Sequence, residues 1–314
     1  MPSIADIRAL HDLPVPELLF RAASVHRAHW NPEELQFCTL DSIKTGGCPE
    51  DCAYCPQAAR YATGVRAEPV KEKERVLAAA RAAKAAGSTR YCMGAAWREV
   101  REGEGFEQVL ALVAEVAALG LEVCVTLGLV QAAQARRLKA AGATVYNHNL
   151  DSSRAFYGTI VSTRSFDDRL ATLRAVREAG LEVCTGGILG LGEQPEDRIQ
   201  FLHELTLLDP PPESIPINQL VAVPGTPLAG TGPVPPMAFI RMIAAARILF
   251  PRSRIRLSAG RTAMSDELQA LAFLAGANSL FTGPRLLTTP NPGASHDHRL
   301  LADLGMRVEK ARNI

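Results

Sequence analysis

The feature that most constrains the fold is a phrase that recurs along the chain, in which an alanine-rich helical stretch ends at a glycine and a short apolar run follows. The phrase occurs at Ala86-Gly87, Leu119-Gly120, Ala141-Gly142, Ala179-Gly180 and Ala275-Gly276. Glycine just past a helix end supplies the left-handed backbone that closes the helix. Short apolar runs rich in β-branched residues are typical of buried parallel strands. The chain is therefore expected to alternate helices with strands.

Segments of this kind predict eight strands. They are QFCTLDSIKT, STRYCMGA, LEVCVTL, ATVYNHNL, LEVCTGGI, SIPINQLVAV, SRIRLSA and ANSLFT. Helices are expected between them, for example over residues 71–86 and 166–179. Alternating units of this number in about 250 residues match a single α/β domain, a (β/α)8 barrel of the TIM type. A doubly wound open sheet is the alternative that the same alternation allows.

No low-complexity linker divides the 314 residues, so we expect one domain. Its predicted parts are an N-terminal helical extension over residues 1–35, the barrel over residues 36–290 and a C-terminal tail over residues 291–314. Lysine and arginine number 34 against 33 aspartates and glutamates, which leaves a net charge of +1. A charge this small argues against a nucleic-acid or membrane-surface partner, because such partners select strongly basic proteins.

The N-terminus has no basic start followed by an apolar block, so no targeting segment is predicted and a cytoplasmic location is expected. The cytosol keeps thiols reduced, which makes structural disulfides an unsuitable explanation for the seven cysteines. Three of them, Cys48, Cys52 and Cys55, form a C-x3-C-x2-C run directly after the first predicted strand. In a barrel this loop lies at the carboxyl end of the strands, where active sites are found.

Three thiolates in one short loop suit a metal centre, and no fourth ligand lies nearby in the sequence. An iron–sulfur cubane held by three thiolates keeps one iron open for a small molecule, which is a catalytic arrangement. A structural zinc site that borrows a distant cysteine is the alternative reading. Cys38, on the first predicted strand, is interpreted as a small buried residue.

Three further cysteines fall at nearly the same depth in three predicted strands. Cys92, Cys124 and Cys184 lie five, four and four residues past the glycine that closes the preceding helix. Residues at one depth on several barrel strands can point inward in one layer, so a second metal centre is predicted. For each cysteine alone, a small buried hydrophobe is the alternative. Arg256 lies on the seventh predicted strand and would need a negative partner, which an iron–sulfur cluster or a carboxylate would supply.

A polar row ends the fourth predicted strand. Alternation places Asn147, Asn149 and Asp151 on one face, with His148 facing away in a structural role. Polar side chains inside an apolar barrel are costly unless they bind something, and amides match a ribose diol or a cyclic urea. A strand-end turn built by asparagine and aspartate is the alternative.

Several long motifs together resemble the biotin synthase family of radical S-adenosylmethionine (SAM) enzymes. They are LDSIKTGGCPEDCAYCPQ, AAGSTRYCMGAAW, YNHNLD, GGILGLGE, INQL, RLSAGR and LLTTPNP. The resemblance implies a barrel of the radical SAM kind and, as activity, SAM-dependent insertion of sulfur into dethiobiotin to form biotin. The sulfur would come from an auxiliary [2Fe–2S] cluster. It also implies a flavodoxin or ferredoxin-type electron donor and a homodimer.

The resemblance assigns roles to residues of this chain. Cys48, Cys52 and Cys55 would hold the [4Fe–4S] cluster, and Cys92, Cys124, Cys184 and Arg256 the [2Fe–2S] cluster. The residues that would bind SAM are Tyr54, Ala95, Asn149, Asp151 and Arg169. Those that would bind the substrate are Asn147, Asn149, Asn218, Thr288 and Thr289. Without the resemblance, Arg169 would be read as a solvated helix residue and the two threonines as an ordinary polar loop.

Two other functions remain as alternatives. A related radical SAM enzyme would use the same barrel without sulfur insertion, and the joint presence of Cys92, Cys124, Cys184 and Arg256 argues against it. A non-catalytic iron–sulfur or zinc protein would have no need of the row formed by Asn147, Asn149 and Asp151.

Overall fold

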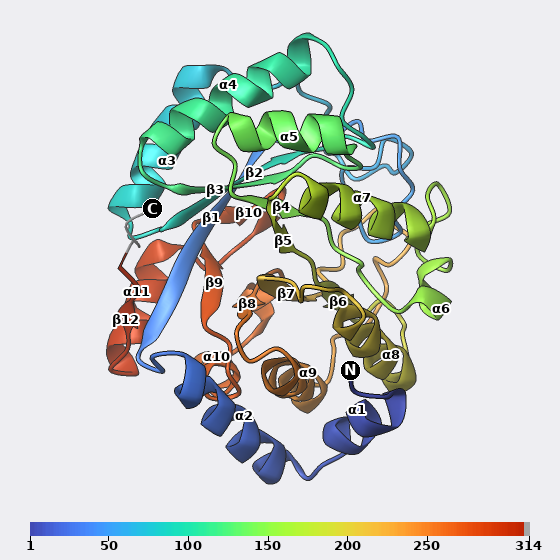
Figure 1. Cartoon of the computed structure of the whole chain (residues 1–314), viewed down its shortest axis with the longest axis vertical. Helices are drawn as coiled ribbons and strands as arrows, with labels where there is room; N and C mark the ends of the chain where they lie inside the picture. The colour runs from blue at the N-terminus through green and yellow to red at the C-terminus, as the bar shows by residue number, and fades with distance from the viewer. Residues whose placement is uncertain (311–314) are drawn as a thin grey trace.

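The computed structural model describes residues 1–310, and its centre is a closed barrel of parallel strands (Figure 1). The barrel strands are β1 (Glu34–Lys44), β2 (Arg90–Ala95), β3 (Glu122–Thr126), β4 (Val145–Asn147), β5 (Glu182–Cys184), β6 (Gly187–Leu189), β7 (Ser214–Gln219), β8 (Arg254–Leu257) and β9 (Ser279–Thr282). The first strand pairs with β2 on one side and with β9 on the other, which closes the sheet. The predicted (β/α)8 barrel is confirmed, and the open sheet is excluded.

A ring of helices surrounds the strands in Figure 1. The helices that follow barrel strands are α3 (Lys73–Ala85), α4 (Glu104–Ala118), α5 (Ala132–Ala140), α6 (Arg154–Tyr157), α7 (Phe166–Glu178), α8 (Pro195–Thr206), α9 (Pro236–Leu249) and α10 (Asp266–Leu274). Gly87 and Gly180 follow α3 and α7 with φ angles of 94° and 73°. This is the left-handed conformation that the recurring phrase predicts.

The predicted fifth strand is in fact two short strands. Thr185 and Gly186 separate β5 from β6, and β6 pairs with β7 from Gly187 opposite Ile217 onward. A Cβ atom on Gly186 would lie 1.9 Å from the carbonyl oxygen of Pro216. The backbone of β7 therefore approaches the break so closely that only glycine fits there.

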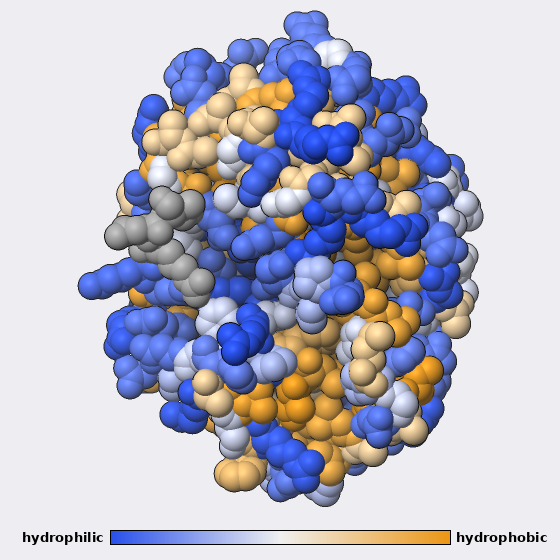
Figure 2. Space-filling view, in the orientation of Figure 1, coloured by the Kyte–Doolittle hydropathy of each residue, from blue (hydrophilic) through white to orange (hydrophobic). Residues whose placement is uncertain are grey.

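Two helices precede the barrel, α1 (Ile4–His11) and α2 (Val15–His29). The first packs against α8 and the second against α9, so the extension covers the outside of the barrel along one side (Figure 1). Figure 2 shows the molecule in the same orientation. Apolar side chains gather in the lower half of this view around α9, and polar side chains cover most of the upper half. Among residues 1–310, no helix is both long and apolar enough to cross a membrane.

The C-terminal segment returns to the barrel. A hairpin of β10 (Arg285–Leu286) and β11 (Thr289–Pro290) is followed by α11 (Ala294–Asp303) and β12 (Arg307–Val308). The last of these pairs in parallel with the start of β1. The final residues of the predicted tail, 311–314, lie outside the described residues.

Inward-facing side chains form layers along the barrel. At the amino ends of the strands the layer is polar and charged, with Gln36, Arg90, Glu122, Glu182 and Arg254 around one pocket. The next layer holds a cluster of thiols, from Cys38, Cys92, Cys124 and Cys184. Above the thiols a larger cavity opens toward the carboxyl ends of the strands. This order places soft ligands at mid-depth and polar binding groups near the mouth.

Candidate active site

A cavity of about 300 Å³ occupies the carboxyl end of the barrel. Every site residue that the sequence predicts contributes to its lining: Cys48, Cys52, Tyr54, Cys55, Cys92, Ala95, Cys124, Asn147, Asn149, Asp151, Arg169, Cys184, Asn218, Arg256, Thr288 and Thr289. These residues come from loops and strands spread over most of the chain. The barrel is what brings them together, because its strands all end at the same face.

The cysteine loop is anchored by its own backbone. The amide of Cys48 donates to the carbonyl of Gln57 at 3.0 Å, and the carbonyl of Cys48 accepts from Ala59 at 2.7 Å. Gly46 just before the loop has a φ of 67°, and a Cβ there would lie 2.4 Å from the carbonyl oxygen of Arg66. The entry to the loop therefore requires glycine, and the folded loop turns its three cysteines toward one cavity.

Burial makes these thiols hard to ionise in the absence of a cation. It raises the pKa of Cys48 and of Cys52, and burial together with the neighbouring Cys52 sulfur raises the pKa of Cys55 to about 12. A bound cationic group reverses this cost, because thiolate is the form that ligates metals. Within residues 1–310, no three metal-binding side chains are arranged around a single ion.

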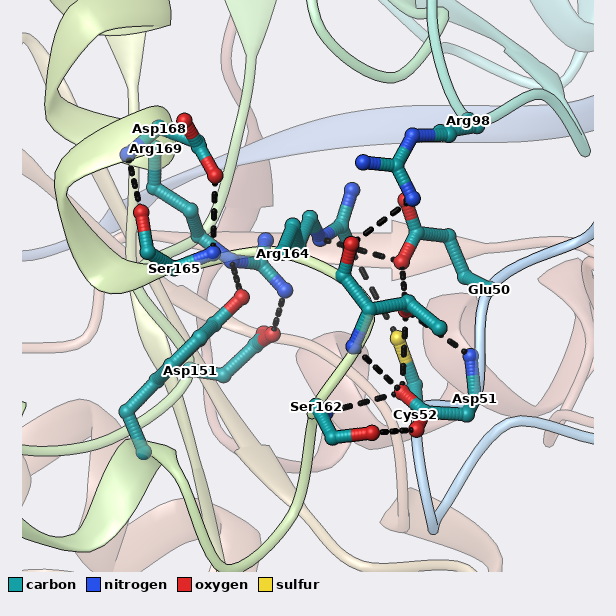
Figure 3. Close-up of polar contacts among 12 residues, drawn as sticks. Glu50, Asp51, Cys52, Arg98, Asp151, Ser162, Arg164, Ser165, Asp168 and Arg169 are labelled. Atoms are coloured by element: carbon teal, nitrogen blue, oxygen red, sulfur yellow. Dashed lines mark hydrogen bonds and ion pairs between the residues drawn. The ribbon is translucent and has the colours of Figure 1, made fainter.

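Two acidic residues of the cysteine loop, Glu50 and Asp51, accept hydrogen bonds from residues 162–163 of a second loop (Figure 3). The Asp51 carboxylate accepts backbone hydrogen bonds from Ser162 at 2.9 Å and Thr163 at 3.2 Å. Burial alone would raise the pKa of Asp51, but these residues lower it to about 2. The next residue, Arg164, places Nη2 at 3.6 Å from the Sγ of Cys52. The sequence analysis missed this contact, because nothing in the pattern predicts that residues 162–164 return to the cysteine loop.

Tyr54, Asp151 and Arg169 form a buried hydrogen-bonded group on the cavity wall. The Tyr54 hydroxyl donates to the Asp151 carboxylate at 2.6 Å, and the Arg169 guanidinium pairs with the same carboxylate. Arg169 also donates from Nε to the Tyr157 hydroxyl at 2.7 Å. Asp151 has a φ of 68°, a strained conformation for a residue with a side chain. Arg169 is therefore a buried cavity residue, which excludes the alternative of a solvated helix residue.

The predicted amide row borders the cavity, although β4 itself ends at Asn147. The Nδ2 of Asn147 donates to the Oδ1 of Asn149 at 3.2 Å, and Asn218 on β7 donates to the carbonyl of Gly187 at 2.9 Å. His148 was expected to face away, but it also contributes to the lining. Regular alternation stops where the strand stops, which explains the difference. Burial holds the pKa of His148 well below its usual value, so its ring is neutral.

The layer beneath contains the three strand cysteines. Cys92 and Cys124 are direct neighbours across β2 and β3, and both belong to the same buried cluster as Cys184. The fourth thiol of this cluster, Cys38, lies 3.6 Å from the hydroxyl of Ser279. It is completely buried, as its reading as a small core residue requires.

Arg256 lies fully buried beside these thiols. Its Nη1 is 3.6 Å from the Sγ of Cys184, its Nε donates to Ser279 Oγ at 2.9 Å, and its Nη2 lies 3.5 Å from Gln36 Oε1. No carboxylate among the described residues pairs with its guanidinium. A buried cation without a carboxylate is costly unless an anionic group binds next to it. The donor set of three thiols and one guanidinium thus fits an anionic iron–sulfur cluster.

The β10–β11 hairpin contributes to the cavity from the last βα connection. Thr288 and Thr289 are half-buried on its lining, and the Thr289 hydroxyl donates to the carbonyl of Leu286 at 3.0 Å. Leu287 has a φ of 56°, which bends the hairpin tightly at this point.

Comparison with known proteins assigns this chain to a family. Residues 42–205 match the Radical SAM superfamily, and residues 216–307 match the Biotin and Thiamin Synthesis associated domain. The chain is 58% identical over 307 residues to the biotin synthase of Gloeobacter violaceus, covering 98% of this chain and 96% of the relative. The chain belongs to the biotin synthase family. The biotin synthase of Nitrosococcus oceani is 59% identical over 98% of this chain and 88% of its own length.

Solved structures of more distant proteins share the fold. Methylornithine synthase superposes with a TM-score of 0.83 at 20% identity, covering 98% of this chain and 94% of that one. The [FeFe]-hydrogenase maturase HydG of Carboxydothermus hydrogenoformans gives a TM-score of 0.82 at 15% identity, over 99% of this chain and 77% of that one. At these identities the likeness establishes the barrel architecture alone.

Membership of the family implies a [4Fe–4S] cluster and SAM, together with the [2Fe–2S] cluster that is typical of biotin synthases. The cavity is compatible with this set on two grounds. Its mouth carries three thiols that burial keeps protonated until a cationic group binds, and its floor carries thiols around an unneutralised guanidinium.

Proposed function

We propose that this chain inserts sulfur into dethiobiotin to form biotin, as its family does. One observation carries the proposal: two separate sets of thiols line one cavity, and the deeper set lies beside Arg256, a buried cation for which residues 1–310 provide no carboxylate partner. Cleavage of SAM needs the outer set alone. The deeper set therefore favours a reaction that consumes a second cluster.

The outer set would hold the [4Fe–4S] cluster through Cys48, Cys52 and Cys55. Arg164 supports this assignment, because its guanidinium already lies 3.6 Å from the Cys52 sulfur and would stabilise a thiolate there. Tyr54, Ala95, Asn149, Asp151 and Arg169 would position SAM. In this arrangement the Asp151 carboxylate would accept from the ribose hydroxyls, and Arg169 would pair with the carboxylate of SAM.

The deeper set would hold the [2Fe–2S] cluster through Cys92, Cys124, Cys184 and Arg256. The hydrogen bond from Arg256 Nε to Ser279 and the contact of its Nη2 with Gln36 fix the guanidinium, which leaves Nη1 directed at the thiols. A fixed guanidinium beside thiolates lowers the cost of burying their negative charge.

Between the two sets, the amide row would bind the ureido ring of dethiobiotin. Asn147, Asn149 and Asn218 present amide groups that can both donate to and accept from a cyclic urea. Thr288 and Thr289 would donate to the carboxylate of the substrate tail. When bound, the clusters and SAM supply the radical chemistry and the sulfur. The chain contributes binding, orientation and the exclusion of water, and no protein acid or base is needed for the C–H step.

Four further features belong to the proposal. A flavodoxin or ferredoxin-type protein would supply electrons, and the active form would be a homodimer, both as in the family. A cytoplasmic location agrees with the seven cysteines, all of which are free thiols in the structure. We also propose that residues 36–290 form the catalytic barrel, to which residues 1–35 and 291–314 are additions.

The test is an anaerobic assay. The protein is reconstituted with iron and sulfide and is supplied with SAM, dethiobiotin and a strong reductant, and biotin is measured by mass spectrometry. The proposal predicts biotin above a control without SAM, and loss of both biotin and deoxyadenosine in Cys52→Ala. Deoxyadenosine without biotin, in protein with an intact second cluster, would contradict sulfur insertion and favour the related radical SAM reaction.

A further inference from the structure

A second pocket, of about 200 Å³, lies at the opposite end of the barrel from the active-site cavity. Its lining includes inward-facing residues from the amino ends of five strands, namely Gln36, Arg90, Glu122, Glu182 and Arg254. Exposed Arg252 lies at its edge. In barrels of this type the amino-terminal face commonly serves stability alone. Two polar groups of this pocket lack a hydrogen-bond partner among the described residues, however, and a purely structural role does not explain them.

Most charges of the pocket are paired within the chain. Arg90 donates from Nε and Nη2 to the Glu122 carboxylate, at 2.5 and 2.9 Å. Arg254 pairs with Glu309 at 2.5 Å, and the Glu213 carboxylate pairs with Arg177 at 2.6 Å. These pairs leave the pocket close to neutral, so a small anion can enter without strong repulsion.

Two buried polar groups on the pocket lining have no partner among the described residues. They are the third guanidinium nitrogen of Arg90, Nη1, and the hydroxyl of Thr89. Arg90 is only 3% exposed, and an unpartnered donor in such a place is costly. A guanidinium nitrogen with a free hydrogen recognises an anion, and the adjacent hydroxyl can donate to the same ion.

The pocket is separated from the thiol layer by a single layer of side chains. The amide of Gln36 spans this layer: its Oε1 lies 3.5 Å from Arg256 Nη2, and its Nε2 lies 3.4 Å from Glu122 Oε2. Arg90 is adjacent to Cys38 in the register of β1 and β2. An ion at Arg90 would therefore lie directly beneath the thiols that we assign to the [2Fe–2S] cluster.

We infer that this pocket binds hydrosulfide and admits it to the auxiliary thiols from the amino-terminal end of the barrel. The inference rests on the proposed function, because a reaction that removes sulfide from the auxiliary cluster requires its replacement. The route through the mouth passes the sites proposed for the substrate, SAM and the first cluster. To reach the thiols from this pocket, hydrosulfide has to cross the one layer of side chains that Gln36 spans.

The experiment measures how fast the [2Fe–2S] cluster forms again after it has been lost. Protein that holds the first cluster but has lost the second is loaded anaerobically with ferric iron, and SAM and dethiobiotin are then added so that the mouth is occupied. Sodium sulfide is then added, and the visible absorption of the [2Fe–2S] cluster is recorded over time. Thr89→Phe fills the pocket, and Arg252→Glu places a negative charge at its exposed edge. We expect each variant to regain the cluster about tenfold more slowly than the unchanged protein.

Thr144→Phe is the matched control. Thr144 precedes β4 as Thr89 precedes β2, and it does not contribute to the pocket. The Thr144→Phe variant should regain the auxiliary cluster at the rate of the unchanged protein. Equal rates in all proteins, or equal slowing in the control, would overturn the inference. Failure of the unchanged protein to form an auxiliary cluster at all would instead overturn the cluster assignment on which the proposed function rests.

Discussion

Three arginines are fully buried among residues 1–310, and their surroundings differ in a way that identifies the site. Arg261 pairs with the Asp297 carboxylate. Arg247 donates to backbone carbonyls of Gly276, Phe250, Pro251 and Ser253. Within the described part of the chain, Arg256 has neither a carboxylate nor a backbone carbonyl as partner, and its contacts are a hydroxyl, a side-chain amide and a thiol. Of these three guanidinium groups, that of Arg256 is therefore the one whose positive charge is available to a bound anionic group.

The thiol layer offers a matched pair of substitutions. Cys124→Ala should abolish the absorption bands of the [2Fe–2S] cluster and leave the [4Fe–4S] cluster able to form. Cys38→Ala removes an equally buried thiol from the same cluster of side chains and should retain both sets of bands. Visible absorption and iron content after reconstitution measure both outcomes. Loss of the auxiliary bands in Cys38→Ala would show that Cys38 is a ligand and not a core residue.

The sequence analysis found the ligand candidates because cysteine depth can be counted from the glycine that closes the preceding helix. It could not find Arg164 or Gln36. Arg164 reaches Cys52 only because the loop after α6 folds back onto residue 51, and this contact spans 112 residues. Gln36 is an ordinary strand residue until the barrel closes and places it between Arg256 and Glu122. Contacts of this kind depend on tertiary structure that no local pattern encodes.

His26 makes stability depend on pH. Burial, followed by the positive charge of Arg247, lowers the pKa of His26 to about 4. The unfolded chain takes up this proton below a pKa of about 6.5, so it binds more protons than the folded chain between these two values. Stability should therefore fall as pH drops through this window, by about 1 kcal/mol from pH 7.5 to 5.5 from this residue. His26→Leu should reduce the dependence, and thermal unfolding at both pH values measures it. A dependence of unchanged size in the variant would contradict the assignment to His26.

At the scale of elements, the break between β5 and β6 is the main departure from the predicted strands. The sequence LEVCTGGI reads as one strand, but the close approach of Pro216 at Gly186 interrupts it. The break lets β5 carry Cys184 into the thiol layer while β6 starts a new pairing with β7. Helix ends were predictable, because a glycine has a local role there. The strand break was not, because it depends on a neighbouring strand.

A substitution at the break tests this account. Gly186→Ala would place a methyl group 1.9 Å from the Pro216 carbonyl oxygen, so a backbone shift is required. We expect a loss of stability of about 3 kcal/mol or more. Gly230→Ala is the control, because a Cβ there meets no atom within 4 Å. The two melting temperatures, compared with that of the unchanged protein, decide the matter. Equal melting temperatures in both variants would contradict the close approach.

At the scale of the whole molecule, the C-terminal segment contacts the barrel at two separate places. Through β12 it pairs with the start of β1, and through Asp297 on α11 it pairs with Arg261 after β8. Both side chains of this ion pair are completely buried. The sequence predicts only a C-terminal tail here and leaves its role open, because a two-residue strand and a single buried aspartate carry no recognisable pattern.

Removal of one partner of this pair should be costly. Asp297→Ala leaves the Arg261 guanidinium buried without its counter-charge, and we expect a loss of about 3–5 kcal/mol. Asp303→Ala removes an exposed carboxylate at the end of the same helix and should change stability by less than about 0.5 kcal/mol. Denaturant unfolding of both variants checks the difference. Similar values for the two would show that the pair adds nothing to the folded state.

The whole barrel arranges its chemistry along one axis. A polar pocket lies at the amino end, thiols and Arg256 at mid-depth, amides above them and the cysteine loop at the mouth. This order is what a reaction needs when a substrate must lie between a source of radicals and a source of sulfur. We therefore propose, as the central point, that the cluster bound by the thiols at mid-depth supplies the sulfur that enters the product.

The most direct test labels that sulfur. The protein is reconstituted with iron and heavy-isotope sulfide, freed of excess sulfide, and given SAM, dethiobiotin and reductant for one turnover in the presence of ordinary sulfide. Mass spectrometry of the biotin formed should show the heavy isotope, and Cys124→Ala should form none. Biotin that contains only ordinary sulfur, or labelled biotin formed equally well by Cys124→Ala, would contradict the account.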